Sequence, residues 1–203
     1  LDRPQELDRF LNEIFEKCEM KISIKTRLGM EDDEEFETLL KIYNQYPLEE
    51  LIIHPRVQKE FYKNTPHMDA FARAYKDSKN VVCYNGDIRA VEDQKRLAED
   101  FPGLDLFMMG RGVLADPALA RKIKGGAPAE KEELRRFHDL LYAAYCEEMS
   151  GDRTILFKMK ELWFYLSDSF TNGKKQFKKI KKCEKCTAYE AVINELFMTE
   201  DVI

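Results

Sequence analysis

The sequence lacks the features that mark membrane, secreted and zinc-binding proteins. None of its apolar runs approaches the roughly 18 consecutive residues of a membrane-spanning helix, so we expect a soluble protein without a membrane partner. Five scattered cysteines in 203 residues do not make a secreted disulfide scaffold, and they favour a reducing cytoplasm. Cys183 and Cys186 form a single Cys-x-x-Cys pair, whereas a structural zinc site needs four ligands, so no metal site is predicted.

The start of the chain and its length also carry information. The first residue is Leu1 rather than Met, and no apolar segment behind a basic flank marks a signal peptide. The 203 residues fall short of the roughly 250 of a complete (β/α)8 barrel. We therefore expect a trimmed portion of a longer protein.

Short apolar runs recur at regular intervals in the first half of the chain. They are residues 21–26 (KISIKT), 51–54 (LIIH), 81–85 (VVCYN) and 106–110 (LFMMG). Segments with helical periodicity separate these runs and also precede the first one; they are residues 5–17, 34–45, 68–76 and 90–99. This alternation predicts parallel strands joined by right-handed helical crossovers, so the first half is expected to be α/β.

A change of composition divides the chain near residue 125. The strand pattern ends at Gly125-Gly126-Ala127-Pro128, and the remaining residues are amphipathic with helical spacing. Helices are predicted there at residues 130–150, 154–166 and 187–198. We therefore expect an α/β domain of residues 1–125 and an all-α domain of residues 126–203.

The net charge of −5 is unevenly distributed along the chain. Residues 153–185 hold ten basic and three acidic residues, a net charge of +7, which leaves −12 on the rest. Seven lysines lie within residues 174–185, a density that suits contacts with the phosphates of a nucleic acid. A merely solubilising helix face is the alternative for this segment.

Polar residues and glycines gather where the predicted strands end. The four ends read Lys25-Thr26-Arg27-Leu28-Gly29, His54-Pro55-Arg56, Asn85-Gly86-Asp87 and Gly110-Arg111-Gly112. Ligands of parallel α/β sheets bind at this edge, and glycines let backbone N–H groups approach an anion. The third and fourth ends therefore predict a phosphate site, to which Arg111 adds charge. The alternatives are a solvated strand end at Lys25, a structural role for His54 and a turn without a ligand at Asn85.

Other conspicuous residues are expected to be structural. His67 and His138 are predicted to be surface or packing residues. Trp163 has helical spacing and Cys83 lies inside a strand run, so both are predicted to belong to the core. Six carboxylates within residues 31–37 are interpreted as a solvated helix start, which the helix dipole favours, rather than as a metal site.

In this order, the strand ends resemble those of the tRNA-dihydrouridine synthase family, flavoenzymes that reduce uridine in tRNA. The matching motifs are KTRLG, HPR with a following tyrosine-containing segment (QKEFYKN), YNGDI and MMGRGVLADP. The helical tail is similar to the RNA-recognition domain of the family, so the resemblance spans nearly the whole chain. It implies the C-terminal half of a (β/α)8 TIM barrel, about four parallel βα units, followed by an all-α helical domain that binds RNA.

The resemblance also implies a cofactor site for FMN. Lys25 would contact the flavin ring and stabilise the negative charge of its reduced form. The other residues implied to hold the flavin or its phosphate are His54, Arg56, Asn85, Gly86, Asp87, Gly110 and Arg111. NADPH would be the reductant and a uracil of the tRNA the substrate. Contacts with the tRNA are expected from Lys174, Lys175, Lys178, Lys179, Lys181 and Lys182.

The proton donor of the family is a cysteine in an Asn-x-x-Cys-Pro motif, which this sequence lacks. The first four βα units of the barrel are expected to be missing as well, so no catalytic residue is expected here and the chain alone should be inactive. Half a barrel leaves strand edges and an apolar interior open, which predicts self-association. The alternative functions are a non-catalytic nucleic-acid-binding module and another phosphate-binding TIM-barrel enzyme.

Overall fold

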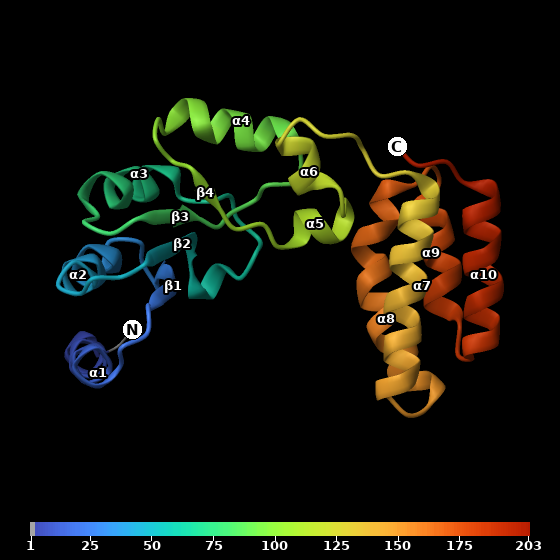
Figure 1. The fold of residues 1–203 in the computed structure, drawn as a ribbon, viewed down its shortest axis with the longest axis horizontal. Helices are drawn as coiled ribbons and strands as arrows, with labels where there is room; N and C mark the ends of the chain where they lie inside the picture. The colour runs from blue at the N-terminus through green and yellow to red at the C-terminus, as the bar shows by residue number, and fades with distance from the viewer. Residues whose placement is uncertain (1–2) are drawn as a thin grey trace. The chain divides into compact units, whose positions relative to one another are not determined.

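The computed structural model describes residues 3–203, which form two compact units (Figure 1). The first unit comprises the residues up to Asp87 together with Gln94–Met109. The second comprises Ile88–Asp93 together with Gly110–Ile203. Over the described range, no helix is both long enough and apolar enough to cross a bilayer.

The first unit contains a four-stranded parallel sheet whose strands follow chain order. Its strands are β1 (Ser23–Gly29), β2 (Glu50–Val57), β3 (Val82–Tyr84) and β4 (Leu106–Phe107). β2 is buried along its length after its first residue, as expected of a central strand with a largely apolar sequence. The predicted α/β fold with consecutive parallel strands is confirmed.

Helices connect the strands and cover one face of the sheet. They are α1 (Pro4–Lys17), which precedes β1, and α2 (Glu35–Tyr43), α3 (Met68–Asp77) and α4 (Val91–Asp100), which join successive strands. The ring of Phe71 on α3 packs edge-on against Tyr84 on β3, with centroids 5.0 Å apart. The hydroxyl of Tyr43 on α2 donates a hydrogen bond to Thr26 Oγ1 on β1 at 3.3 Å. Thr26 and Tyr84 therefore face the helices.

The opposite face of the sheet, here called the inner face, carries the charged residues. Successive side chains of a strand point to opposite faces, so the neighbours of the helix-facing residues point away from the helices. The register places Arg27 of β1 beside His54 of β2, and Lys25 beside Ile52. Cys83 of β3 lies next to Ile52 on the same face.

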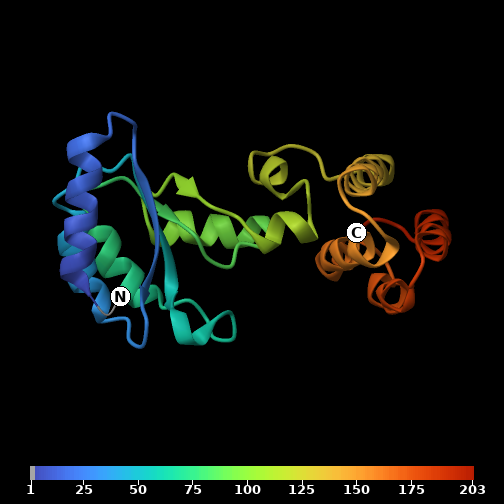
Figure 2. The same ribbon diagram turned by 90° about the horizontal axis from the view of Figure 1, so that it is seen from below.

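The second unit is helical. It contains two short helices, α5 (Arg111–Ala115) and α6 (Leu119–Ile123), and four longer ones, which Figure 2 shows nearly end-on. The longer helices are α7 (Lys131–Glu148), α8 (Asp152–Leu166), α9 (Gly173–Lys182) and α10 (Cys186–Thr199). Trp163 is fully buried among them and packs against Phe170 and Phe197, which confirms its predicted core position. The predicted division into independent domains at residue 125 stays a prediction.

His138 lies inside this helical core and is held by polar partners. Trp163 Nε1 donates to the Tyr189 hydroxyl at 2.8 Å, and that hydroxyl lies 2.5 Å from His138 Nε2. The hydroxyl therefore donates to Nε2, which leaves the proton on Nδ1 to bond Asp139 Oδ1 at 2.8 Å. Burial lowers the pKa of His138, so the ring is neutral, and its packing role is as predicted.

Candidate functional site

Arg56, near the carboxyl end of β2, is the centre of a polar cluster on the inner face. Its side chain is only 1% exposed. Nη2 donates to Asp87 Oδ2 at 2.6 Å, Nε donates to the backbone oxygen of Asn64 at 2.8 Å, and Nη1 lies 3.2 Å from His54 Nε2. Arg56 therefore joins the end of β2 to the turn after β3 and to the loop after β2.

His54 is a neutral imidazole at the base of this cluster. Burial, followed by the positive charges of Lys25, Arg27 and Arg56, lowers the pKa of His54 to about 4. Arg56 can only donate hydrogen bonds, so Nε2 of His54 accepts and the proton sits on Nδ1. The hydrogen bond from Arg56 thus fixes one tautomer of the histidine.

Two further cations lie on β1, on the same face. Lys25 is exposed, and partial burial together with Arg27 lowers the pKa of its ammonium group. Arg27 donates to the backbone oxygens of Val57 and Gln58, both at 3.2 Å. Its guanidinium carbon lies 5.6 Å from the centre of the Tyr62 ring, within the range of a cation–π contact. The inner face therefore carries positive charge at the end of β1.

Tyr62 belongs to the site, although the sequence analysis did not name it as a site residue. Its ring lies 5.7 Å from that of His54, and its side chain is 55% exposed. It follows the short 3-10 helix η1 (Gln58–Glu60) in the loop after β2. The tyrosine of the QKEFYKN segment was the signal that could have identified it, because this segment directly follows the HPR motif.

His67 fixes the base of the same loop. Its Nδ1 lies 2.7 Å from Asp33 Oδ2, and its Nε2 lies 2.9 Å from Glu60 Oε1. The hydrogen bond to Glu60, followed by that to Asp33, raises the pKa of His67. Both ring nitrogens are engaged, so His67 has the packing role that was predicted.

Within residues 3–203, no group of three His, Cys, Asp or Glu side chains is arranged to hold a metal ion.

The turn after β3 is closed by local contacts of its own residues. Asn85 Nδ2 donates to the backbone oxygen of Met108 at 2.8 Å, which ties this turn to the segment after β4. A Cβ at Gly86 would lie 2.1 Å from the Tyr84 hydroxyl, so a larger residue here would have to displace the ring of the buried Tyr84. The carboxylate of Asp87 bonds Arg56, and its charge is therefore already partly neutralised.

Gly110 and Arg111 belong to the second unit, where Gly110 caps α5 and Arg111 is its first residue. A Cβ added at Gly110 would meet no described atom within 4 Å outside its chain neighbours, so there is room for a side chain at this position. A Cβ at the buried Gly112 would lie 2.1 Å from the backbone oxygen of Ile88, so that glycine serves packing.

The lysines of α9 fall into two groups. Lys174 is ion-paired with Asp168, and Lys179 with Glu195. The other four, Lys175, Lys178, Lys181 and Lys182, are exposed, and none has an ion-pair partner within the described part of the chain. These four are the lysines of α9 most available to an anionic partner.

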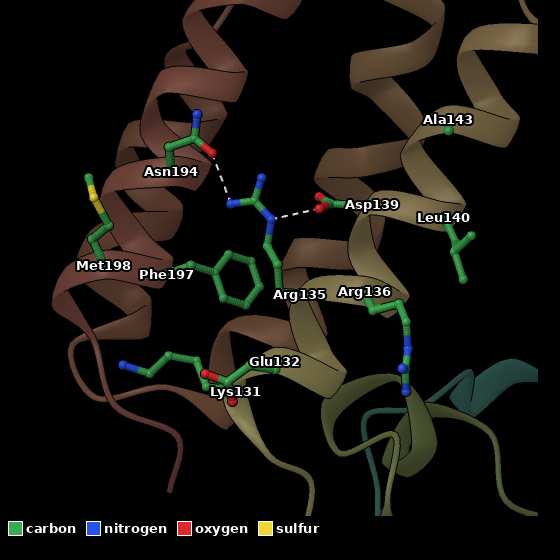
Figure 3. Close-up of a pocket in the computed structure, with 10 residues that line it drawn as sticks. All are labelled: Lys131, Glu132, Arg135, Arg136, Asp139, Leu140, Ala143, Asn194, Phe197 and Met198. Atoms are coloured by element: carbon green, nitrogen blue, oxygen red, sulfur yellow. Dashed lines mark hydrogen bonds and ion pairs between the residues drawn. The ribbon is translucent and has the colours of Figure 1, made fainter.

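A groove of about 840 Å³ lies between α7 and α10 (Figure 3). Arg135 crosses it, donating to Asp139 Oδ2 at 2.7 Å and to Asn194 Oδ1 at 2.8 Å. Its guanidinium carbon lies 5.2 Å from the centre of the Phe197 ring. These contacts tie α7 to α10, so Arg135 has a structural role in this groove.

A parallel sheet whose carboxyl edge carries cations, glycines and a neutral histidine is typical of α/β proteins that bind phosphorylated ligands. The family model described as "Dihydrouridine synthase (Dus)" matches residues 1–200. The chain belongs to the dihydrouridine synthase family, which confirms the family expected from the strand-end motifs.

Curated relatives agree with this family. The tRNA-dihydrouridine(16) synthase of Aquipseudomonas alcaligenes is 29% identical over 116 residues, which cover 57% of this chain and 36% of the relative. The probable tRNA-dihydrouridine synthase 2 of Bacillus subtilis is 30% identical over 135 residues, covering 64% and 41%. The tRNA-dihydrouridine(16) synthase of Shewanella oneidensis is 28% identical over 168 residues, covering 81% and 52%. The matches thus cover between about a third and a half of each relative.

Proposed function

We propose that this chain is the flavin-binding and tRNA-binding portion of a tRNA-dihydrouridine synthase. In this proposal the sheet is the C-terminal half of a (β/α)8 barrel, and residues 126–203 form the RNA-binding domain. Bound FMN would pass a hydride from NADPH to a uracil of the tRNA, giving 5,6-dihydrouridine. A tRNA substrate and NADPH imply a cytoplasmic reaction. The observation that carries the proposal is the cluster of Lys25, His54, Arg56 and Asp87 on the inner face.

The donor set of the inner face fits a planar cofactor that becomes anionic on reduction. Lys25 is an exposed cation and would stabilise the negative charge of the reduced ring. His54 is neutral and held in one tautomer by Arg56, so it offers a ring of fixed orientation. Arg56 is buried and fully committed to its partners, and its role would be to position His54 and the turn after β3.

The phosphate of the cofactor would be held by backbone amides of the glycine-containing strand ends. Asn85, Gly86, Gly110 and Arg111 are assigned to it from the motifs, and Arg111 would add positive charge. Asp87 carries a negative charge and is paired with Arg56, so within the proposed site it would hold Arg56 rather than touch the phosphate.

No cysteine of this chain is assigned the role of proton donor. Cys83 is 4% exposed in β3, and burial raises the pKa of its thiol to about 11. It is therefore a core residue, as predicted. Self-association through the inner face of the sheet stays a prediction.

A fluorescence titration of FMN with the 203-residue chain tests the flavin site. We expect the wild type to bind FMN and Lys25→Ala to weaken binding about tenfold, the effect of losing one charge-assisted contact. Lys21→Ala is the matched control, because Lys21 precedes β1 and is exposed and ion-paired with Glu49. Lys25→Ala should also lower the reduction potential of the bound flavin, since its cation favours the reduced form. An absence of binding, or equal losses in both variants, contradicts the proposal.

A further inference from the structure

A second groove of the helical unit lies outside the sites described so far. It has a volume of about 660 Å³, within the range of roughly 300–1,000 Å³ that is usual for ligand pockets. It is lined by α8 and by the two residues that follow α9; the lining residues are Arg153, Thr154, Leu156, Phe157, Lys160, Cys183 and Glu184. Lys160 Nζ donates to the backbone oxygen of Cys183 at 2.6 Å. This bond ties the two walls together, so the groove is preformed.

An exposed aromatic ring forms one wall of the groove. Phe157 is 68% exposed, although a phenylalanine on an ordinary helix surface gains free energy by burial. Phe164 lies seven residues further along α8, on the same face, and is 57% exposed. The ring of Phe164 lies 6.0 Å from that of Phe177 on α9. Aromatic side chains thus continue from the groove onto the lysine-bearing helix.

Cations surround these rings. Lys158 Nζ lies 5.9 Å from the centre of the Phe157 ring, and Lys181 Nζ lies 5.7 Å from that of Phe177. Arg153 is exposed at the groove and has no ion-pair partner among the described residues. The carboxylate of Glu184 also lines the groove, and carboxylates there can accept a hydrogen bond from an amino group of a base. Exposed aromatics interleaved with cations are the composition of surfaces that bind single-stranded nucleic acids.

We infer that this groove binds one unpaired nucleotide of an RNA, with its base stacked on Phe157 and its phosphate near Arg153. The inference rests on the proposed RNA-binding function and deepens it, because the lysines of α9 account only for phosphate contacts. A base in a duplex has both faces covered by its neighbours, whereas an unpaired base offers a free face to an aromatic ring. The groove therefore selects loops or single strands over duplex RNA.

The test measures binding of a single-stranded oligoribonucleotide that carries one 2-aminopurine, and of the same strand in a duplex. Stacking on Phe157 is expected to change the 2-aminopurine fluorescence of the single strand on binding. Phe157→Leu should weaken single-strand binding about tenfold and leave duplex binding unchanged, whereas Phe157→Tyr should bind as the wild type does. Phe10→Leu is the matched control, because Phe10 is a 59% exposed phenylalanine on α1.

The outcomes separate this inference from the proposed function. If Phe157→Leu binds the single strand as the wild type does, while removal of the α9 lysines abolishes RNA binding, the stacking site is wrong and the RNA-binding function stands. That result would leave the groove to another occupant, such as a protein segment. If the wild-type chain binds neither RNA and loss of the α9 lysines changes nothing, the proposed function fails and the inference fails with it.

Discussion

Replacing Arg56 with methionine is expected to lower the free energy of unfolding by about 3 kcal/mol. Methionine fills much of the space of the arginine stem but removes the ion pair from Arg56 to the Asp87 carboxylate and the hydrogen bond from Arg56 to the Asn64 carbonyl. Removal of one member of a buried ion pair usually costs about 3–5 kcal/mol. The lower end applies because the Asp87 side chain is 32% exposed and is partly solvated. Urea denaturation followed by circular dichroism measures the change.

A double-mutant cycle isolates the ion pair from other effects of the substitution. Asp87→Asn alone should be destabilising, and the double variant with Arg56→Met should lose less than the two single losses combined. Arg73→Met, at an exposed arginine of α3, is the control and should change stability by less than about 0.5 kcal/mol. The measurement is made at pH 8, where His54, whose pKa of about 4 is lowered in part by Arg56, is neutral with or without the arginine. A loss below about 1 kcal/mol, or strictly additive effects, would show that the pair does not hold the strand ends.

Replacing Lys175, Lys178, Lys181 and Lys182 together with alanine is expected to weaken tRNA binding about 10²-fold at 0.1 M salt. Each lysine that neutralises a phosphate contributes about −0.9 to the slope of log K against log salt concentration. The slope should therefore fall in magnitude by about 3 to 4. The four positions are exposed and alanine favours helices, so α9 should stay folded. Filter binding or anisotropy over a range of salt concentrations gives both quantities.

Two comparisons make the lysine result specific to the free cations of α9. A control that replaces Lys41, Lys76, Lys79 and Lys95, which are exposed in the first unit, removes the same charge and should leave the affinity within about threefold. Replacing Lys174 and Lys179 should have a smaller effect, because Asp168 and Glu195 already neutralise them. Equal losses in the control and the α9 variant would mean that binding follows net charge and not this helix.

The order of strands and helices was predictable because each element carries a clear period and ends at polar residues or glycine. β2 is longer than its predicted apolar run, since Pro55, Arg56 and Val57 continue the strand although only part of this stretch is apolar. α9 was not predicted. Gln176 and Ile180 are the only side chains of that helix that are buried, and two such positions among many lysines are too few to show a helical period in the sequence. α5 and α6 have five residues each, too few to show a helical period.

The sequence predicted which strand ends form the candidate site, but not the hydrogen bonds and the ion pair that join their side chains. Parallel topology brings neighbouring carboxyl ends together, which is why His54 and Asp87 could be grouped from the sequence. The sequence does not show that Arg56 is buried and ion-paired with Asp87. The burial of Arg56 depends on how deeply the end of β2 lies within the fold. For the same reason the sequence placed Trp163 in the core but did not show that Phe157 on the same helix is exposed.

An NMR titration of the ¹⁵N-labelled chain with FMN, and in parallel with riboflavin, tests the central claim most directly. Riboflavin carries the same ring without the phosphate. The account predicts that FMN shifts the amide signals of Gly86 and Gly110, and that riboflavin shifts them much less while both ligands perturb Lys25 and His54. Unchanged glycine amides at excess FMN, or shifts confined to α7–α10, would contradict it.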